Sequence, residues 1–261
     1  MVKISIVISC RNEAPVISKT LESLVGVSDD IVVYDNGSTD GTQLVVKQFP
    51  VNLQEGSFDG FGPTKNKANA FTRYDWILSL DADEAIDEEL KQSLLAFDPG
   101  TEKVVYDLSF KSFFGNAILK YGEWGGDHHI RLFNKKHVSW DAEPVHEQLL
   151  VPAGFAIKKM KGYVLHRTMA DINDYVTKMT GYAMLNAEKY FRQGKKASWF
   201  KLRCSPGFTF FNYYILKLGF LDGHAGYVCA KMTAYYTFLK YARLKELANN
   251  EQRNKEQGMP K

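Results

Sequence analysis

Residues 76–84 read WILSLDADE, an apolar run that ends in acidic residues. Residues 76–80 have the length of a buried strand, and short apolar runs of this kind are typical of parallel sheets. Asp81 and Asp83 come directly after it, at the carboxyl end, where open α/β sheets bind ligands. Two carboxylates one residue apart can converge on one hard divalent cation. The alternative is a strand end followed by the acidic first turn of a helix.

Strand-like and helix-like stretches alternate around this run, from residue 3 to about residue 110. The pattern predicts strands at 4–9 and 31–35, a weaker one at 51–53, and helices at 15–24, from about 39, at 65–73 and at 87–97. Alternation at this spacing favours the α/β fold class, with a doubly wound, mostly parallel sheet. Beyond it the sequence predicts short β-like pieces, including 129–133 and 163–165, and then a long helix at 171–192.

Polar residues also follow the first two expected strands. Ser9, Arg11 and Glu13 end the first, and Asp35 ends the second within the run YDNGSTDGT. An acidic residue at such a strand end can bind ribose hydroxyls. A turn with a helix cap explains Asp35 equally well, and an ion pair explains Arg11 and Glu13. Because parallel strands end at one edge of a sheet, we expect these residues to lie near Asp81.

Composition limits the class of protein. The chain has 261 residues, with 45% apolar and 24% charged residues, which is ordinary for a globular protein and excludes wholesale disorder, collagen and coiled coil. The three cysteines lie far apart, so a disulfide framework is not expected and a reducing compartment is favoured. The N-terminus shows no basic segment with a cleavage site, so no signal peptide is expected.

The net charge of +3 is an average over two unlike parts. Residues 1–194 contain 21 Lys and Arg against 26 Asp and Glu, whereas residues 195–261 contain 12 against 4. Thirteen of the 35 aromatic residues fall between 199 and 241, in a region whose pattern predicts short helices. Aromatic faces flanked by basic residues suit the interface of an anionic bilayer. Internal packing is the main alternative; nucleic-acid binding is not expected, because the rest of the chain is acidic.

Four motifs taken in order give a specific resemblance: SIVISCRNEA at 5–14, VVYDNGSTDGT at 32–42, GFGPTKNKA at 60–68 and WILSLDADE at 76–84. The chain resembles an inverting family 2 glycosyltransferase with the GT-A fold. It is most similar to the bacterial branch that builds lipopolysaccharide core and related surface glycans. RLF at 131–133, VHE at 145–147, LH at 165–166 and GFLDG at 219–223 extend the likeness over about residues 3–248.

The resemblance implies roles for individual residues. The donor-binding set would be Ser9, Arg11, Glu13 and Asp35 at the nucleoside, Lys65 and Asn66 beside the base or diphosphate, and Asp81 at the ribose. Asp83 would ligate Mg²⁺ or Mn²⁺ together with Asp81, and His166 would lie on the metal or the diphosphate.

Inversion at an anomeric carbon needs a general base that takes the proton of the acceptor hydroxyl. Glu147 is the expected base, because it follows the RLF motif by about the distance of the acidic E-D element in related enzymes. This chain has His146-Glu147 there instead, and Asp127 and Glu143 are the alternatives. Trp124 is expected to stack on a sugar face, unless it is only structural.

The resemblance also implies a domain organisation and a location. We expect a catalytic domain at 1–197, divided into a nucleotide-binding half (1–110) and an acceptor-side half (111–197), then a membrane-interface extension at 198–248 and a flexible tail at 249–261. The expected enzyme is cytoplasmic and peripheral on the inner face of the cytoplasmic membrane. It would transfer a sugar from a UDP-sugar to a hydroxyl of a lipid-linked glycan. The alternatives are a sugar nucleotidyltransferase, which ordinarily has a glycine-rich phosphate loop, and an inactive nucleotide-binding scaffold.

Overall fold

The computed structural model describes residues 3–142 and 147–256. Its residues pack into two compact units. The first consists of Met1–Lys111 and Gly126–Arg167, and the second of Ser112–Gly125 and Thr168–Lys261. Two long strands, β6 (Val104–Phe114) and β11 (Ala156–Met169), begin in the first unit and end in the second.

The first unit is built on a sheet whose first four strands are parallel. They lie in the order β3-β2-β1-β4 and comprise β1 (Ile4–Cys10), β2 (Ile31–Asp35), β3 (Asn52–Glu55) and β4 (Trp76–Asp81). Strands β1, β2 and β4 form where the sequence has short runs rich in Ile, Val and Leu, because such residues fit a sheet that is covered on both faces. Strand β3, with the sequence NLQE, is a partly exposed edge strand. The expected parallel sheet is confirmed.

Antiparallel strands extend the sheet beyond β4 in the order β8-β6-β11-β5. Strand β8 (His128–Asn134) runs antiparallel to both β4 and β6, and β5 (Glu84–Ile86) runs antiparallel to β11. A short strand, β7 (Ala117–Leu119), pairs with the end of β6. The pairing of β5 with β11 brings the chain just after Asp81 next to residues 164–166.

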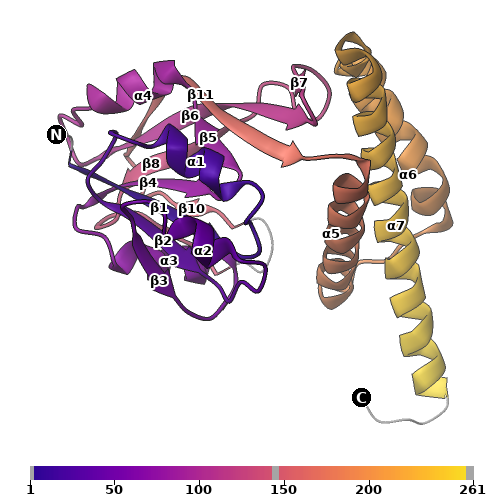
Figure 1. Cartoon of the computed structure of the whole chain (residues 1–261). Coiled ribbons are helices and arrows are strands. Elements are labelled where there is room, and N and C mark those ends of the chain that lie inside the picture. The colour runs from indigo at the N-terminus through magenta and orange to yellow at the C-terminus, as the bar shows by residue number, and fades with distance from the viewer. Residues whose placement is uncertain (1–2, 143–146, 257–261) are drawn as a thin grey trace. The chain divides into compact units, whose positions relative to one another are not determined.

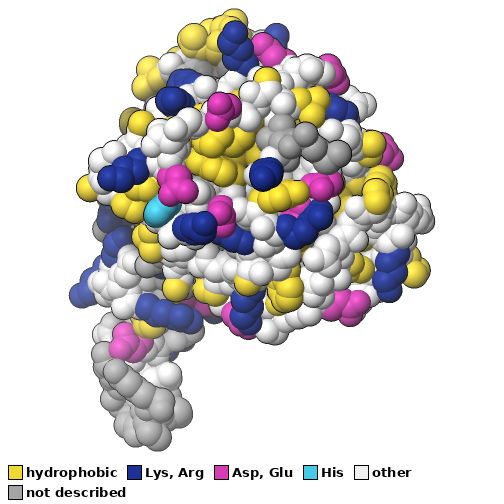
Figure 2. All heavy atoms as spheres, turned by 90° about the vertical axis from the view of Figure 1, so that its left-hand side faces the viewer, with side chains coloured by type: hydrophobic (Ala, Val, Ile, Leu, Met, Phe, Trp, Pro, Cys, Tyr) yellow, Lys and Arg dark blue, Asp and Glu magenta, His cyan; other side chains and the backbone are white. Residues whose placement is uncertain are grey.

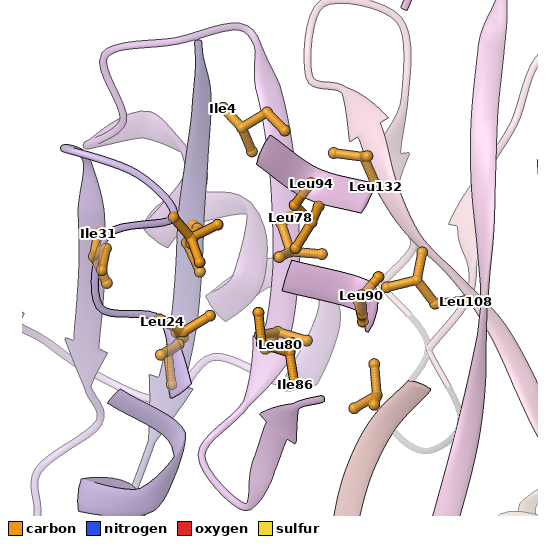
Figure 3. Packing of buried hydrophobic residues seen from close by; sticks show 14 of the residues in the cluster. Ile4, Leu24, Ile31, Leu78, Leu80, Ile86, Leu90, Leu94, Leu108 and Leu132 are labelled. Atoms are coloured by element: carbon orange, nitrogen blue, oxygen red, sulfur yellow. The ribbon is translucent and has the colours of Figure 1, made fainter. Parts of the chain in front are cut away.

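Helices cover both faces of this sheet, as a doubly wound fold requires. On one face, α1 (Ile17–Ser23) and α4 (Glu88–Leu95) pack with Ile4, Leu78 and Leu132 in the main hydrophobic core (Figure 3). On the other face, α3 (Phe61–Ala70) contributes Ala68 to a core that contains Val7 and Ile77. The alternation of Ile6 and Val7 between the two cores is the period of two expected of a strand.

Two smaller elements complete the first unit. Helix α2 (Thr42–Val46) follows β2, and β9 (Ser139–Trp140) pairs antiparallel with β10 (Leu149–Leu150) in a separate small sheet.

On the face shown in Figure 2, acidic and basic side chains are interspersed, so no large patch of one sign is visible there.

The second unit is helical. Helices α5 (Ile172–Arg192) and α6 (Trp199–Phe211) both pack along α7 (Gly223–Glu256), as Figure 1 shows. A π-helical turn η1 (Asn212–Leu216) and a 3-10 turn η2 (Gly219–Asp222) join α6 to α7. Tyr175 and Cys229 are buried in the core of this unit. Asp222 accepts hydrogen bonds of 2.9 Å from the backbone N–H groups of both Lys120 and Tyr121.

Helix α5 was expected in the acceptor-side half of the catalytic domain (111–197). In the structure it packs with α7, because Tyr175 and its neighbours bury their side chains there, and both helices belong to the second unit. Short helices were expected in residues 198–248, but α7 is one helix of 34 residues that continues to Glu256. Residues 257–261 of the expected tail lie outside the described residues.

Within the described residues, no helix combines the length and the apolar character needed to cross a bilayer. The three cysteines form no disulfide: Cys10 and Cys229 are buried, and Cys204 is exposed.

Candidate active site

The loops after β1 and β2 are joined by hydrogen bonds. The side chain of Asn12 accepts from the Thr39 N–H at 2.8 Å, and Ser38 Oγ accepts from the Asn12 N–H at 2.9 Å. Asn12 has a φ of 58°, in the left-handed region that Asn tolerates better than most residues. In the sheet register Ser9 lies opposite Asp81. The strand ends that carry the expected donor-binding residues therefore meet at one edge.

Asp35 is turned into the protein rather than toward solvent. Its side chain is fully buried, and Oδ1 accepts from the N–H groups of Gly37 at 2.8 Å and Ser38 at 2.7 Å. Burial and the nearby Asp35 carboxylate together raise the pKa of the Cys10 thiol far above its usual value. The structure thus gives Asp35 a role in shaping the loop, and a direct contact of Asp35 with a nucleoside stays a prediction.

Asp81, at the end of β4, lies between two cations. Lys65 Nζ is 2.9 Å from Oδ1, and Arg131 Nη2 is 3.1 Å from Oδ2. Partial burial acts to raise the pKa of the Asp81 carboxyl, but the charges of Lys65 and Arg131 outweigh it and hold that pKa well below its usual range. Asp81 is therefore a carboxylate with both oxygens engaged.

Arg131 and Glu84 fix the position of Asp81 through further contacts. Arg131 Nη2 also contacts Glu84 Oε1 at 2.7 Å, and Glu84 Oε2 accepts from the backbone N–H of Asp81 at 2.8 Å. Glu84 is 1% exposed and Arg131 8% exposed. Neither Glu84 nor Arg131 had been assigned a role from the sequence. The available signal was the charge of Arg131 inside the apolar strand HHIRLFN, since a buried charge requires a partner.

Asp83 and His166 lie together on neighbouring elements. His166 Nε2 is 3.4 Å from Asp83 Oδ2, and His166 is opposite Glu84 in the register of β11 with β5. Partial burial acts to lower the pKa of His166, but the hydrogen bond and charge of Asp83, with smaller effects of Glu84 and Asp81, raise it to about 9.

The residues present fit a metal only in part. No three His, Cys, Asp or Glu side chains converge within the described parts of the chain. Mg²⁺ in phosphate-transferring sites is held by one or two carboxylates, the phosphates and water. Asp83, about one-fifth exposed, fits that mode. His166 beside it has a raised pKa and binds a cation only after it releases its proton. Asp81 does not fit in this arrangement, because Lys65 and Arg131 engage its oxygens.

Glu147 comes just before β10, and its Oε1 is 2.8 Å from Lys65 Nζ. Lys65 thus joins the carboxylate expected at the ribose to the expected base. The Asn66 amide donates to the Trp140 carbonyl at 2.8 Å, and its oxygen accepts from the Trp140 N–H at 2.9 Å. A place for Asn66 beside the base or diphosphate stays a prediction. The alternative base Glu143 lies outside the described residues.

Asp127, the other alternative base, comes directly before β8. Its Oδ1 is 3.0 Å from His129 Nε2, and the Phe110 ring contacts both His129 and His166. Partial burial acts to raise the pKa of Asp127, but the hydrogen bond and charge of His129 outweigh it and lower that pKa.

Trp124 belongs to the second unit. Its Nε1 donates to Tyr175 Oη at 3.4 Å, and its ring packs on the core of that unit. The structure thus shows a packing role for Trp124, and stacking on a sugar stays a prediction.

A partly parallel sheet with acidic residues at the ends of β2 and β4, together with a helical C-terminal region, is the architecture of a GT-A glycosyltransferase. The model of the family "Glycosyl transferase family 2" matches residues 5–159, more than half of the chain. The chain therefore belongs to glycosyl transferase family 2, and the resemblance found in its motifs is confirmed.

Relatives extend the likeness over nearly the whole length. The chain is 27% identical over 256 residues to an uncharacterized glycosyltransferase of Rickettsia felis, covering 94% of this chain and 90% of that protein. It is 26% identical over 252 residues to the lipopolysaccharide core biosynthesis glycosyltransferase LpsC of Rhizobium meliloti, covering 92% and 91%. Among solved structures, S. aureus TarS 1-349 in complex with UDP-GlcNAc covers 98% of this chain and 92% of that one, with 16% identity and a TM-score of 0.47.

Proposed function

We propose that this family 2 glycosyltransferase transfers a sugar from a UDP-sugar to a hydroxyl of a lipid-linked glycan such as lipopolysaccharide core, with inversion of the anomeric centre. One observation carries the proposal: Lys65 Nζ lies 2.9 Å from Asp81, at the end of β4, and 2.8 Å from Glu147. A candidate donor-binding carboxylate and a candidate base thus share one place in the first unit. The name of the relative LpsC supports the choice of acceptor.

In the proposed reaction Glu147 accepts the proton of the acceptor hydroxyl. The hydroxyl oxygen then forms a bond to the anomeric carbon while the bond from that carbon to the diphosphate oxygen breaks, and UDP leaves with the electron pair. Asp127 is the alternative base, and its carboxylate is paired with His129 at 3.0 Å as that of Glu147 is with Lys65. Glu147 is preferred because Lys65 also contacts Asp81 and so places Glu147 beside the expected donor site.

The donor would lie on the loops after β1 and β2. Ser9, Arg11 and Glu13 are on this edge, and the exposed Arg11 is available to an anionic or polar ligand there. Asp35 would contribute by holding the Gly37 and Ser38 N–H groups in place, since its own carboxylate is buried.

Asp83 and His166 are the residues that would hold Mg²⁺ or Mn²⁺. The cation supplies positive charge that stabilises the departing diphosphate. Of the two acidic residues in the motif, Asp83 would therefore bind the metal and Asp81 the donor ribose.

The first test is metal-dependent nucleotide binding. We expect UDP with Mn²⁺ to stabilise the wild-type protein, by about 2.7 kcal/mol at a UDP concentration 100 times its dissociation constant. Asp83→Ala should lose the part of this stabilisation that depends on Mn²⁺, because a metal ligand is removed. Thermal-shift titrations of UDP, GDP and CMP with and without Mn²⁺ measure both effects.

The matched control for this test is Asp75→Ala, which removes an exposed carboxylate paired with Lys136 far from β4's carboxyl end. It should behave as the wild type. An Asp83→Ala protein that retains the full Mn²⁺-dependent stabilisation would overturn the metal assignment.

We also propose that the second unit binds an anionic membrane surface, where a lipid-linked acceptor resides, on the inner face of the cytoplasmic membrane. Helix α6 buries none of its residues, although its sequence is rich in aromatics. Large apolar side chains are more than half exposed on α6 and η1, namely Trp199, Phe200, Phe208 and Leu216. Lys201, Arg203 and Lys217 lie among them in the sequence, and the Arg203 guanidinium lies 5.6 Å from the centre of the Trp199 ring. Apolar side chains with basic neighbours favour an anionic bilayer over a second, equally basic copy of the chain.

Vesicle flotation tests the membrane proposal with the full-length chain. We expect the protein to float with phosphatidylglycerol vesicles and to be released by high salt, because the attraction is partly electrostatic. The triple variant Phe200→Ser, Phe208→Ser, Leu216→Ser should remain with the soluble fraction. Leu44→Ser, which removes an equally exposed side chain from the first unit, is the control and should float normally. A triple variant that floats like the wild type would contradict the proposal.

A further inference from the structure

Helix α3 holds the hairpin formed by β9 and β10 at three points. Gly62 lies so close to the hairpin that a Cβ atom there would be 1.7 Å from the Asp141 carbonyl oxygen. Asn66, one helical turn further on, pairs with both backbone groups of Trp140. Lys65 contacts Glu147 on the returning side of the hairpin at 2.8 Å. These contacts make α3 the element that places the hairpin in the first unit.

The Lys65 side chain is buried, and its ammonium group lies between two carboxylates and an aromatic ring. Its side chain is 5% exposed, and Nζ lies 4.7 Å from the centre of the Trp140 ring. A lysine ammonium has three N–H donors, and here it faces Asp81 Oδ1 and Glu147 Oε1. Two of the three donors therefore already have carboxylate acceptors within the protein.

We infer that Lys65 is a positioning residue that holds Glu147 at a set place relative to Asp81, so that the acceptor hydroxyl meets its base beside the bound donor. The inference rests on the proposed function, because it takes Glu147 as the base. It departs from the role that the family resemblance implies for Lys65, a contact with the base or diphosphate of the donor. The effect of Lys65 on the reaction then passes through Glu147.

The two roles of Lys65 differ in what its removal changes. If Lys65 positions Glu147, Lys65→Met should lower kcat by about 100-fold, the loss expected when a reacting group is misplaced by about 1 Å. The dissociation constant of UDP with Mn²⁺ should change far less than kcat, because Arg131 still holds Asp81. If Lys65 binds the diphosphate, UDP binding should weaken instead. Calorimetry with UDP and Mn²⁺, together with turnover of the UDP-sugar on lipopolysaccharide acceptor, separates the two.

A double-mutant cycle with Glu147→Gln tests whether Lys65 acts through Glu147. We expect the double variant Lys65→Met, Glu147→Gln to transfer sugar no more slowly than Glu147→Gln alone, because groups that act as a unit are not additive. Lys65→Gln, which keeps an N–H donor, should recover part of the loss. Lys65→Gln also provides the comparison with the wild type if the Lys65→Met protein does not fold. Lys67→Met is the control, because Lys67 lies two residues away on α3 and pairs with the exposed Asp59.

Three results would overturn the inference: weaker UDP binding by Lys65→Met with kcat retained, additive losses in the cycle, or a wild-type kcat for both Lys65 variants. Each of these leaves Glu147 as the base. Normal turnover by Glu147→Gln, in contrast, would remove the proposed base itself, so the two failures are distinguishable.

Discussion

Glu147→Gln is expected to lower sugar transfer by about 10²–10⁴-fold while UDP binding is kept, because an amide of the same shape cannot take the proton of the acceptor hydroxyl. The amide oxygen can still accept a hydrogen bond from Lys65, which contacts Glu147 Oε1 at 2.8 Å in the wild type. The hairpin should therefore keep its place. Initial rates of transfer from the UDP-sugar to lipopolysaccharide acceptor, with calorimetry of UDP binding on the same preparation, measure both parts of the expectation.

Matched variants decide between the candidate bases. Asp127→Asn removes the carboxylate that pairs with His129, and Glu143→Gln removes the acidic residue before Pro144. Both should retain far more activity than Glu147→Gln. Near-normal transfer by Glu147→Gln with a large loss in either of the others would move the base to that residue. A wild-type protein that binds UDP and transfers no sugar would favour the nucleotide-binding scaffold.

Arg131→Met is expected to destabilise the first unit by about 3–5 kcal/mol, the usual cost of removing one partner from a buried ion pair. Glu84 is 1% exposed and contacts Arg131 at 2.7 Å, so the substitution leaves a buried carboxylate without its cation. Asp81 loses one of its two cationic partners as well. Urea unfolding followed by fluorescence of the buried Trp76 and Trp140 measures the loss.

A second substitution separates the buried charge from lost packing. Adding Glu84→Gln to Arg131→Met should restore part of the stability, because the unpaired charge is then removed. Lys136→Met, which breaks an exposed ion pair with Asp75, should leave the midpoint almost unchanged. If Arg131→Met unfolds at the same urea concentration as Lys136→Met, the buried network does not stabilise this unit.

Local sequence patterns predicted the parallel strands well, but missed β6 and gave only residues 163–165 of β11. The strands at 4–9, 31–35 and 76–80 appear within a residue or two of their expected ends, since each is a short Ile-, Val- or Leu-rich run. The C-terminal region was predicted less well. Short helices were expected from its mixed aromatic and basic residues, but residues 227–256 contain no Gly or Pro to end a helix, and α7 runs through them.

The sequence by itself determined the fold class, the family and the acidic edge of the sheet, because these depend on apolar runs and on motifs whose order can be read along the chain. Only the tertiary structure decided which charged groups meet. Lys65 reaches Glu147 across 82 positions, Arg131 reaches Glu84 across 47, and Asp35 turns inward to the N–H groups of its own loop. Such pairings depend on how α3, β8 and the hairpin pack on the sheet. The spacing of residues along the chain does not specify that packing.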